Sequence, residues 1–493
     1  MKKTSYLILI SLLVIGGFLR LFRLNQTLQF LGDQGRDALI VRRLLVEHDP
    51  VFIGPVTSVG NMYLGPAYYY FMLPFFALTY PSPMGPVYAV AILGTLTIYV
   101  IYRLGKEMVG EQAALLAAFF YTFGWIFIIY SRFSWNPNPA PIVSMFMVYF
   151  TYKAWTKDSK YWIWVSVFFS VLMQLHYLTL LALPAAGIFW LLDARKKFSK
   201  KQNKLKPFVI QTITSIGIFI TSLTPLILFD LKHQFLNANA FYNILFGKEE
   251  QVRNQSQLIY TLIESLGRSQ HILFEITTNH ERWLNILMVT VFMGLLFLVL
   301  KKKSQFFSGE RVLSVWLLVG IIGTSFYKSS VFDHYIAYLF PVTCLLLGVL
   351  LTYCWQHKLL KAVPVLFITW FAISNITQYD YSRVSWTVQD IENYSKNILK
   401  QVDKSEPYSL VGINSYNDIY AMNYRYYLTA WGKPPLETEA ANEAKKLVIV
   451  NENYHPIKQV LDLPIYEIVI FPDKQNREVL SYPHAPDLII LHR

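Results

Sequence analysis

The chain has 493 residues, of which 54% are hydrophobic and only 15% are charged, and its mean hydropathy is +0.35. Soluble domains carry about 25% charged residues, so this composition excludes an ordinary water-soluble globule. The net charge of +13 does not indicate nucleic-acid binding, because the basic residues cluster in short loops between apolar stretches. Cys344 and Cys354 lie within one apolar stretch, so we expect neither a disulfide nor a metal site from them.

The N-terminal segment carries Lys2 and Lys3 before an apolar stretch from Tyr6 to Phe22. A cleavable signal peptide would place small residues at a cleavage site after a short apolar core. Here Gly16 and Gly17 are followed by bulky and basic residues, which do not form such a site. We therefore expect an uncleaved first span with a cytoplasmic N-terminus.

A membrane-spanning helix needs about 20 mostly apolar residues. Eleven stretches of the sequence approach this requirement, which predicts a polytopic α-helical membrane protein with about eleven transmembrane helices. The stretches are 6–22, 87–103, 112–130, 139–155, 161–176, 178–192, 208–229, 283–300, 312–327, 335–354 and 362–376.

The stretch 63–80 is also apolar, and the segment 161–192 could form one long span or two short ones. Charge favours two short spans and a non-spanning 63–80, since this arrangement places more Lys and Arg residues in the inner loops. Pro66 and Pro74 suit an interfacial or re-entrant segment, but whether 63–80 spans the membrane stays open.

This topology gives a membrane domain over residues 1–377 and an extracytoplasmic tail over residues 378–493. Within the membrane domain, residues 23–86 and 230–282 form two sizeable outer loops. The tail contains short apolar stretches at 409–413, 446–450, 466–471 and 487–491, which predict buried strands, and a helical pattern over 416–428. We expect a small α/β domain there.

The first outer loop contains the sequence LGDQGRDALIVRRLL, with Asp33 and Asp37 four residues apart on one face of a predicted helix. A carboxylate at the boundary between water and lipid can act as a general base. The competing interpretation is that Asp33 caps a helix over 34–46, because aspartate is a good N-cap residue.

Polar residues also gather in SRFSWNPNPAP at 131–141. Arg132 could bind a phosphate with two hydrogen bonds, and Asn136 and Asn138 could bind sugar hydroxyls. An interfacial aromatic and arginine anchor with proline breaks is the equal alternative.

Two further polar clusters lie next to predicted spans. One is KSSVFDHYIAYLFP, whose candidate residues are Lys328, Asp333, His334 and Tyr335, and a short polar turn is the alternative. The other is His176–Tyr177, where the alternative is a histidine at the membrane interface whose hydrogen bonds are satisfied by nearby groups. No nucleotide-binding, HExxH or CxxC pattern occurs.

The order of these segments resembles the membrane glycosyltransferases with the C-type fold, specifically the bacterial family 39 group. That group includes protein O-mannosyltransferases and the lipid A aminoarabinose transferase. The resemblance covers residues 1–200 and the DHYIAYLFP block. It is carried by the acidic first loop, GPAYYYFMLPF at 65–76, Gly85–Pro86 and RLGKEMVGE at 103–111.

The resemblance implies an enzyme of the bacterial inner membrane. It would transfer a hexosyl or pentosyl group from a polyprenyl-phosphate donor to a hydroxyl of a protein, lipid or glycan, with inversion and with Asp33 as the base. Cations would stabilise the departing phosphate. The candidates for phosphate binding are Arg132, Arg36, Lys328 and His176; those for substrate binding are Asp37, Asn136, Asn138, Asp333, His334 and Tyr335.

The sequence departs from this family at three places. The family often has Asp-Glu where this chain has Asp33–Gln34, and a second acid where Asn136 and Asn138 stand. The aminoarabinose transferase type carries Lys-Gly at the position of His176–Tyr177, which argues against that activity. With fewer acids we expect no metal site and no required cofactor, although an assisting divalent cation stays an alternative.

Three other functions stay open at this stage. They are a lipid or oligosaccharide transporter or flippase, a polymerase or ligase of surface polysaccharide, and a non-catalytic envelope protein whose tail binds a partner. Transporters usually show inverted repeats and helices broken at the midplane, whereas the polar residues here gather at the outer ends of predicted spans.

Overall fold

The structure is a computed structural model that describes residues 3–57, 62–199, 205–246, 308–327, 331–402 and 406–493, with isolated positions between 290 and 300. The chain forms two compact units. The first unit comprises Met1–Phe22, Phe52–Tyr68 and Tyr88–Asp380; the second comprises Arg23–Val51, Tyr69–Val87 and Tyr381–Arg493.

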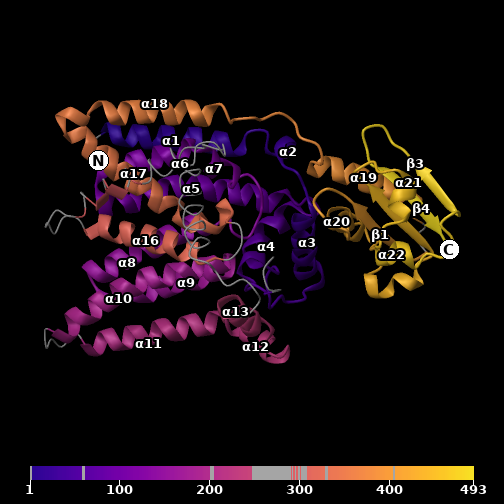
Figure 1. The fold of residues 1–493 in the computed structure, drawn as a ribbon, viewed down its shortest axis with the longest axis horizontal. Coiled ribbons are helices and arrows are strands. Elements are labelled where there is room, and N and C mark those ends of the chain that lie inside the picture. Colours follow the sequence, from indigo (N-terminus) through magenta and orange to yellow (C-terminus); the bar gives the residue numbers. More distant parts are fainter. Residues whose placement is uncertain are drawn as a thin grey trace. The chain divides into compact units, whose positions relative to one another are not determined.

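The first unit is helical, and most of its helices run along one common direction (Figure 1). Four of the helices are each preceded by a short 3₁₀ segment. These segments are Ser159–Tyr161, Tyr177–Leu181, Asp333–Leu339 and Lys358–Leu360. The helices are α1 (Lys3–Leu21), α5 (Met84–Val109), α6 (Glu111–Phe123), α7 (Trp125–Ile129), α8 (Ala140–Thr156), α9 (Trp162–Leu175), α10 (Ala182–Ser199), α11 (Leu205–Ser222), α12 (Thr224–Lys232), α13 (Leu236–Phe246), α16 (Ser308–Ser325), α17 (Phe340–Gln356) and α18 (Ala362–Ile376).

Among the described residues, six helical stretches are long and apolar enough to cross a membrane. The remaining predicted spans are also helical but are shorter or less apolar, except 283–300, which lies largely outside the described residues. The chain is therefore a helical protein of the membrane type, and the count of eleven stays a prediction. The six stretches are Lys3–Leu21, Met84–Val109, Tyr177–Ser199, Leu205–Ser222, Asp333–Gln356 and Lys358–Ile376.

Helix α4 (Ala67–Thr79) occupies the ambiguous stretch 63–80. It has 13 residues and contains Pro74. At 1.5 Å per residue it is about 20 Å long, which is shorter than the roughly 30 Å hydrocarbon core of a bilayer. This length supports the predicted interfacial or re-entrant segment.

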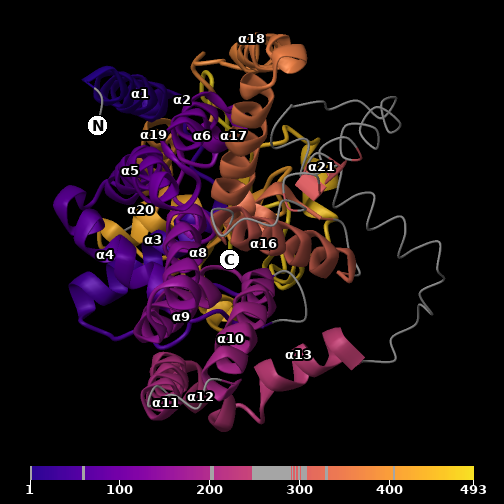
Figure 2. The same cartoon turned by 90° about the vertical axis from the view of Figure 1, so that its left-hand side faces the viewer.

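Small residues allow the helices of the first unit to approach closely. Helices α6 and α17 lie side by side and pack tightly (Figure 2). A Cβ at Gly348 of α17 would lie 2.2 Å from the carbonyl oxygen of Ala113 in α6, so only glycine permits this separation. Helices in lipid associate largely through such close packing.

The second unit contains a four-stranded mixed sheet in the order β1-β2-β4-β3, and its strands are β1 (Tyr408–Ile413), β2 (Lys446–Asn451), β3 (Arg477–Leu480) and β4 (Asp487–His492). Strands β1 and β2 are parallel, with Val411 opposite Ile449, and the other pairs are antiparallel. The other elements are α2 (Leu24–Thr27), α3 (Gly32–Arg42), a π-helical turn (Arg43–Glu47), most of α4, α19 (Val388–Gln401), α20 (Met422–Ala430), a 3₁₀ segment (Thr438–Glu443), α21 (Ile457–Leu461) and α22 (Tyr466–Val469).

Three of the four strands predicted for the tail are confirmed, and one is wrong. The stretch 466–471 forms the helix α22, whose Ile468 is buried in the same core as Phe471. Two buried apolar residues three positions apart fit a helical turn better than a strand. The fourth strand is instead β3, which is exposed and charged, as suits the edge of a sheet.

Candidate functional site

Helix α3 begins in the first predicted outer loop, and its start is held by Gln34. The N-cap position is Leu31, and the Gln34 side-chain oxygen accepts a hydrogen bond from the Leu31 amide at 2.9 Å. Asp33 lies inside the first turn and bonds to Arg36 instead. The interpretation of Asp33 as the helix cap is therefore wrong, because the side chain that bonds to the N-cap backbone is that of Gln34.

Asp33 and Asp37 lie on one face of α3, as the spacing predicted, and Arg36 joins them. The Arg36 Nη1 atom is 2.8 Å from Asp33 Oδ1. Its Nε and Nη2 atoms donate to Asp37 Oδ1 at 3.0 and 2.9 Å. One cation thus fixes two carboxylates, which leaves the cluster with a net negative charge. Arg36 pairs with both carboxylates, and its predicted contact with a donor phosphate stays a prediction.

Asp37 is buried, whereas Asp33 is open to solvent. The Asp37 side chain is 1% exposed and also accepts a hydrogen bond from the Tyr69 hydroxyl at 3.2 Å. Burial raises the pKa of the Asp37 carboxyl, although the charge of Arg36 opposes that shift. Asp33 is 58% exposed. Of the two carboxylates, that of Asp33 is open to water and that of Asp37 is buried against Arg36 and Tyr69; the predicted substrate contact of Asp37 stays a prediction.

The opposite face of α3 packs against the loop and helix that follow β1. A Cβ at Gly32 would lie 2.6 Å from Asp418 Oδ2, and a Cβ at Gly35 would lie 2.4 Å from the backbone nitrogen of Asn423. Asn423 also donates its side-chain amide to the Phe30 carbonyl at 3.2 Å. The tail domain therefore sets the position of the helix that carries Asp33.

Asp418 supplies a further carboxylate next to the start of α3. Its Oδ2 atom accepts a hydrogen bond from the Met422 amide at 2.7 Å, so it caps α20. Burial raises the pKa of the Asp418 carboxyl, and the like charge of Asp33 adds to that shift. Sequence reasoning missed this residue because it follows a short strand far along the chain.

Glu452 is a buried acid that directly follows β2. Its Oε1 atom accepts hydrogen bonds from the hydroxyls of Tyr424 at 2.8 Å and Tyr416 at 2.9 Å. Burial raises the pKa of the Glu452 carboxyl to about 7, against the effect of these two hydrogen bonds. An acid directly after a buried strand is a sequence signal that could have identified it.

The raised pKa of Glu452 predicts a pH-dependent stability. The folded state holds a proton that the unfolded state releases between about pH 4.5 and 7, so stability falls as pH rises through this window. Glu452→Gln should remove the dependence and stabilise the protein by on the order of 2 kcal/mol at pH 8, with little change at pH 4.5. Thermal unfolding of the full chain in detergent at both values tests this, with the exposed Glu443→Gln as the control. An equal change at both values would contradict it.

In the first unit, Arg132 bonds to the end of α1. Its Nη1 atom donates to the carbonyls of Leu19 at 2.8 Å and Arg20 at 3.0 Å, and its Nη2 atom donates to the Phe22 carbonyl at 2.8 Å. The last carbonyls of a helix have no partner within the helix, so a buried arginine satisfies them well. The geometry favours the anchor interpretation of Arg132, and its phosphate contact stays a prediction.

Arg20 makes the reciprocal contact, which the sequence did not reveal. It is fully buried, and its Nη2 atom donates to the Tyr121 carbonyl at 2.8 Å near the end of α6. Its Nε atom donates to the Ser131 hydroxyl at 3.3 Å. Arg20 thus ties α1 to the end of α6, and Arg132 ties the segment after α7 to the end of α1.

Removing the Arg132 guanidinium should expose its structural role. Arg132→Met leaves three carbonyls without this donor, and we expect a loss of about 2–4 kcal/mol in stability. Thermal unfolding in detergent measures this loss, with the exposed Lys157→Met as the control.

If Arg132 contacts the donor phosphate, Arg132→Met should also raise the KM for a lipid-phosphate donor and leave the KM for the acceptor unchanged. An effect confined to the acceptor would reject that contact.

His176, His334 and Tyr335 come together in an aromatic cluster. The His334 ring centroid is 4.5 Å from Trp135 and 5.6 Å from His176, and the His176 ring is 5.0 Å from Tyr335. The His176 Nδ1 atom accepts a hydrogen bond from the Leu178 amide at 3.3 Å, which starts the following 3₁₀ segment. The structure thus joins two clusters that are about 160 residues apart in sequence.

Asn136 and Asn138 have local partners. The Asn136 amide donates to the Leu175 carbonyl at 2.5 Å, and the Asn138 amide donates to the Phe133 carbonyl at 2.7 Å. Asp333 begins the 3₁₀ segment before α17, and Lys328 lies outside the described residues. Their predicted contacts with substrate stay predictions. Within the described part of the chain, no group of three or more His, Cys, Asp or Glu residues could hold a metal ion.

Residues 64–224 match the family model described as dolichyl-phosphate-mannose-protein mannosyltransferase. Among proteins of curated function, none matches the sequence significantly. The fold is similar to that of ArnT from Cupriavidus metallidurans, in the structure bound to undecaprenyl phosphate, with a TM-score of 0.60 and 11% identity. The alignment covers 99% of this chain and 98% of that one.

The archaeal oligosaccharyltransferase AglB from Archaeoglobus fulgidus, in complex with an inhibitory peptide and a dolichol-phosphate, is similar with a TM-score of 0.50 and 12% identity. That alignment covers 91% of this chain and 69% of AglB. At these identities the likeness shows the fold, while the family model adds a sequence match over residues 64–224. The predicted resemblance to membrane glycosyltransferases with the C-type fold is confirmed.

Proposed function

We propose that this chain, which has the C-type glycosyltransferase fold, transfers a sugar from a polyprenyl-phosphate donor to a hydroxyl acceptor at the outer face of the bacterial inner membrane. The observation that carries the proposal is the placement of Asp33. It is an exposed carboxylate in the first turn of a short helix, with Oδ1 fixed by Arg36. Asp33 Oδ2 has no hydrogen-bond partner among the described residues.

The chemistry follows from this carboxylate. The acceptor oxygen attacks the anomeric carbon while the bond between that carbon and the phosphate oxygen breaks. Asp33 Oδ2 takes the proton of the acceptor hydroxyl, and the polyprenyl phosphate leaves with the bonding electrons. Attack opposite to the leaving phosphate inverts the anomeric centre. A general base of this kind contributes about 10²- to 10⁴-fold in rate.

Arg36 and Asp37 act as positioning residues for Asp33. Arg36 donates a hydrogen bond to Asp33 Oδ1, and the buried Asp37 accepts hydrogen bonds from Nε and Nη2 of Arg36. A fixed base avoids part of the entropy cost of reaching the reactive geometry. The groups that contact the departing phosphate are proposed as Arg132, Lys328 and His176, in addition to Arg36.

The relatives support the class of donor. ArnT is bound to undecaprenyl phosphate and AglB to a dolichol-phosphate, and both of these lipids are polyprenyl phosphates. Such donors carry their activation energy in the phosphate linkage, which fits a chain without a nucleotide-binding motif. The sugar is hexosyl or pentosyl, and the acceptor is a protein, lipid or glycan hydroxyl.

The test uses the purified full chain in detergent with polyprenyl-phosphate sugars that are labelled in the sugar. We expect label to move to an acceptor from an envelope extract, with release of one polyprenyl phosphate for each sugar. No membrane gradient exists in detergent, so this result would also exclude a transporter. Failure with a panel of mannosyl, glucosyl and pentosyl donors, while the chain binds these lipids, would overturn the proposal.

A further inference from the structure

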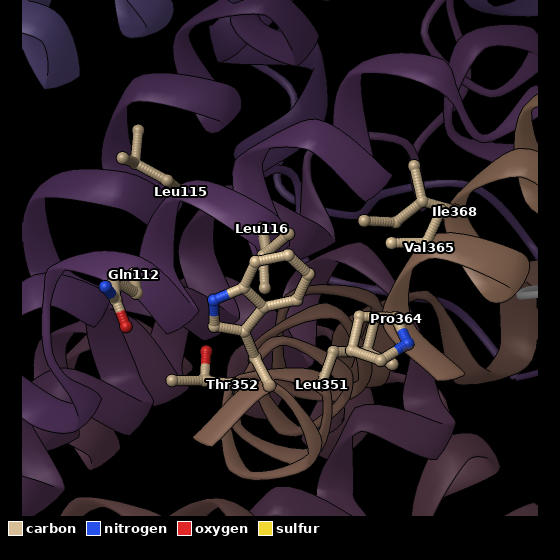
Figure 3. A pocket seen from close by; sticks show the side chains of 9 residues that line it. Gln112, Leu115, Leu116, Leu351, Thr352, Pro364, Val365 and Ile368 are labelled. Carbon is tan, nitrogen blue, oxygen red and sulfur yellow. The ribbon is translucent and has the colours of Figure 1, made fainter. Parts of the chain in front are cut away.

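An apolar pocket of about 310 Å³ lies between α6, α17 and α18, and none of the candidate site residues lines it (Figure 3). Its volume is at the lower end of the range of ligand pockets, which is about 300–1,000 Å³. It therefore suits part of a chain-like ligand. The lining residues are Gln112, Leu115 and Leu116 of α6, Leu351, Thr352 and Trp355 of α17, and Pro364, Val365 and Ile368 of α18.

The lining of the pocket is almost entirely apolar. Gln112 lies in the first turn of α6, and Trp355 lies in the last turn of α17. Leu116, Leu351 and Ile368 lie about one helical turn, or roughly 5 Å, further from these helix ends. Figure 3 shows Gln112 of α6 and Thr352 of α17 on one side of the pocket, and Pro364, Val365 and Ile368 of α18 on the other.

The turn between α17 and α18 exposes apolar residues of the kind found at the surface of a membrane. Leu359, between α17 and α18, is 97% exposed, and Trp355 is 52% exposed. Tryptophan favours the boundary between lipid and water. The sequence places this turn among the predicted inner loops.

Two lysines of the turn between α17 and α18 are close in sequence to lining residues of the pocket. Lys358 follows Trp355 by three residues, and Lys361 precedes Pro364 by three. Both are exposed, and neither has an ion pair within the described residues. The acid beside Gln112 is Glu111, which pairs with Lys106 at 3.1 Å and does not neutralise the turn.

We propose that this groove binds one acyl chain of an anionic phospholipid, whose phosphate contacts Lys358 and Lys361. The apolar lining contacts the acyl chain, and the two lysines select for negative charge. Basic residues next to helix grooves at a membrane surface recognise anionic headgroups in this way. The site is separate from sugar transfer and does not depend on the proposed function.

The test uses phosphatidylglycerol and phosphatidylcholine with brominated chains, which quench a tryptophan in contact with the chain. The full chain and Trp355→Phe are titrated with each lipid in mixed micelles, and the quenching lost in Trp355→Phe belongs to Trp355. We expect half-maximal quenching at a roughly tenfold lower fraction of phosphatidylglycerol than of phosphatidylcholine.

The variant Lys358→Gln/Lys361→Gln should lose this preference, and the matched control Lys157→Gln/Lys160→Gln, which removes two charges at another predicted inner turn, should keep it. Equal quenching by the two lipids, or a preference that survives in Lys358→Gln/Lys361→Gln, would overturn the proposal. So would displacement by undecaprenyl phosphate together with no displacement by unlabelled phosphatidylglycerol, because the groove would then hold a polyprenyl chain.

Discussion

Replacement of Asp33 by asparagine is expected to lower kcat by about 10²- to 10⁴-fold. Asparagine has the same shape but cannot take the proton of the acceptor hydroxyl. The exposed position of Asp33 makes a folding defect a poor explanation, since its side chain bonds to Arg36 alone among the described residues. The measurement is transfer of labelled sugar from a polyprenyl-phosphate donor under saturating donor.

The chain offers a close control for this variant. Asp49 lies in the same predicted outer loop, is 54% exposed and also pairs with an arginine, Arg43, at 3.0 Å. Asp49→Asn should keep full activity, because no feature of the site involves it. If Asp33→Asn turns over as fast as Asp49→Asn, the assignment of Asp33 as the base is wrong.

A split between kcat and KM separates the chemical role from a binding role. Loss of a base lowers kcat and leaves the donor KM nearly unchanged. Loss of a donor contact would instead raise the donor KM. The second pattern would move Asp33 from catalysis to donor recognition.

The helices were predictable because lipid imposes a simple rule on the sequence. Each span must be long and apolar, so most stretches marked by hydropathy, such as 362–376, appear as helices with nearly the predicted bounds. The local sequence also predicted the helix that carries Asp33, and the spacing of four residues predicted that Asp33 and Asp37 share one face of it. These features depend on residues close together in sequence.

The features that escaped prediction depend on residues far apart in sequence. The packing of α3 on α20 joins Gly35 to Asn423, and the buried Arg20 joins α1 to α6. Arg132 looked like a phosphate ligand because its sequence neighbours are polar, but its hydrogen bonds go to carbonyls more than 100 residues away. Periodicity and composition contain no information on such pairings. The error at 466–471 has a different cause, since short apolar runs fit a strand and a helical turn equally well.

The second large effect is expected at Gly35, which sets how α3 rests on the tail domain. A Cβ there would lie 2.4 Å from the Asn423 nitrogen and 2.5 Å from the Met422 carbonyl oxygen. Both atoms belong to the backbone of α20, so no side chain can turn aside to make room. Gly35→Ala must therefore displace α3, and Asp33 with it.

A shift of about 1 Å in a reacting group can cost roughly 100-fold in rate. We expect Gly35→Ala to lower kcat by about that factor, although the carboxylate itself is unchanged. Overpacking should also reduce stability by about 1–3 kcal/mol, measured by thermal unfolding in detergent. The rate loss should remain at temperatures well below the unfolding transition, where the protein is fully folded.

Gly187 of α10 provides the matched substitution, because a Cβ there would meet no atom within 4 Å. Gly187→Ala should preserve activity and raise stability slightly, by up to about 1 kcal/mol, since alanine favours the helix. If Gly35→Ala behaves like Gly187→Ala, the tail does not position Asp33. If Gly35→Ala loses stability but keeps kcat at low temperature, the contact between α3 and α20 serves folding alone. Loss of kcat in the folded variant would tie the tail domain to the chemistry of the first loop.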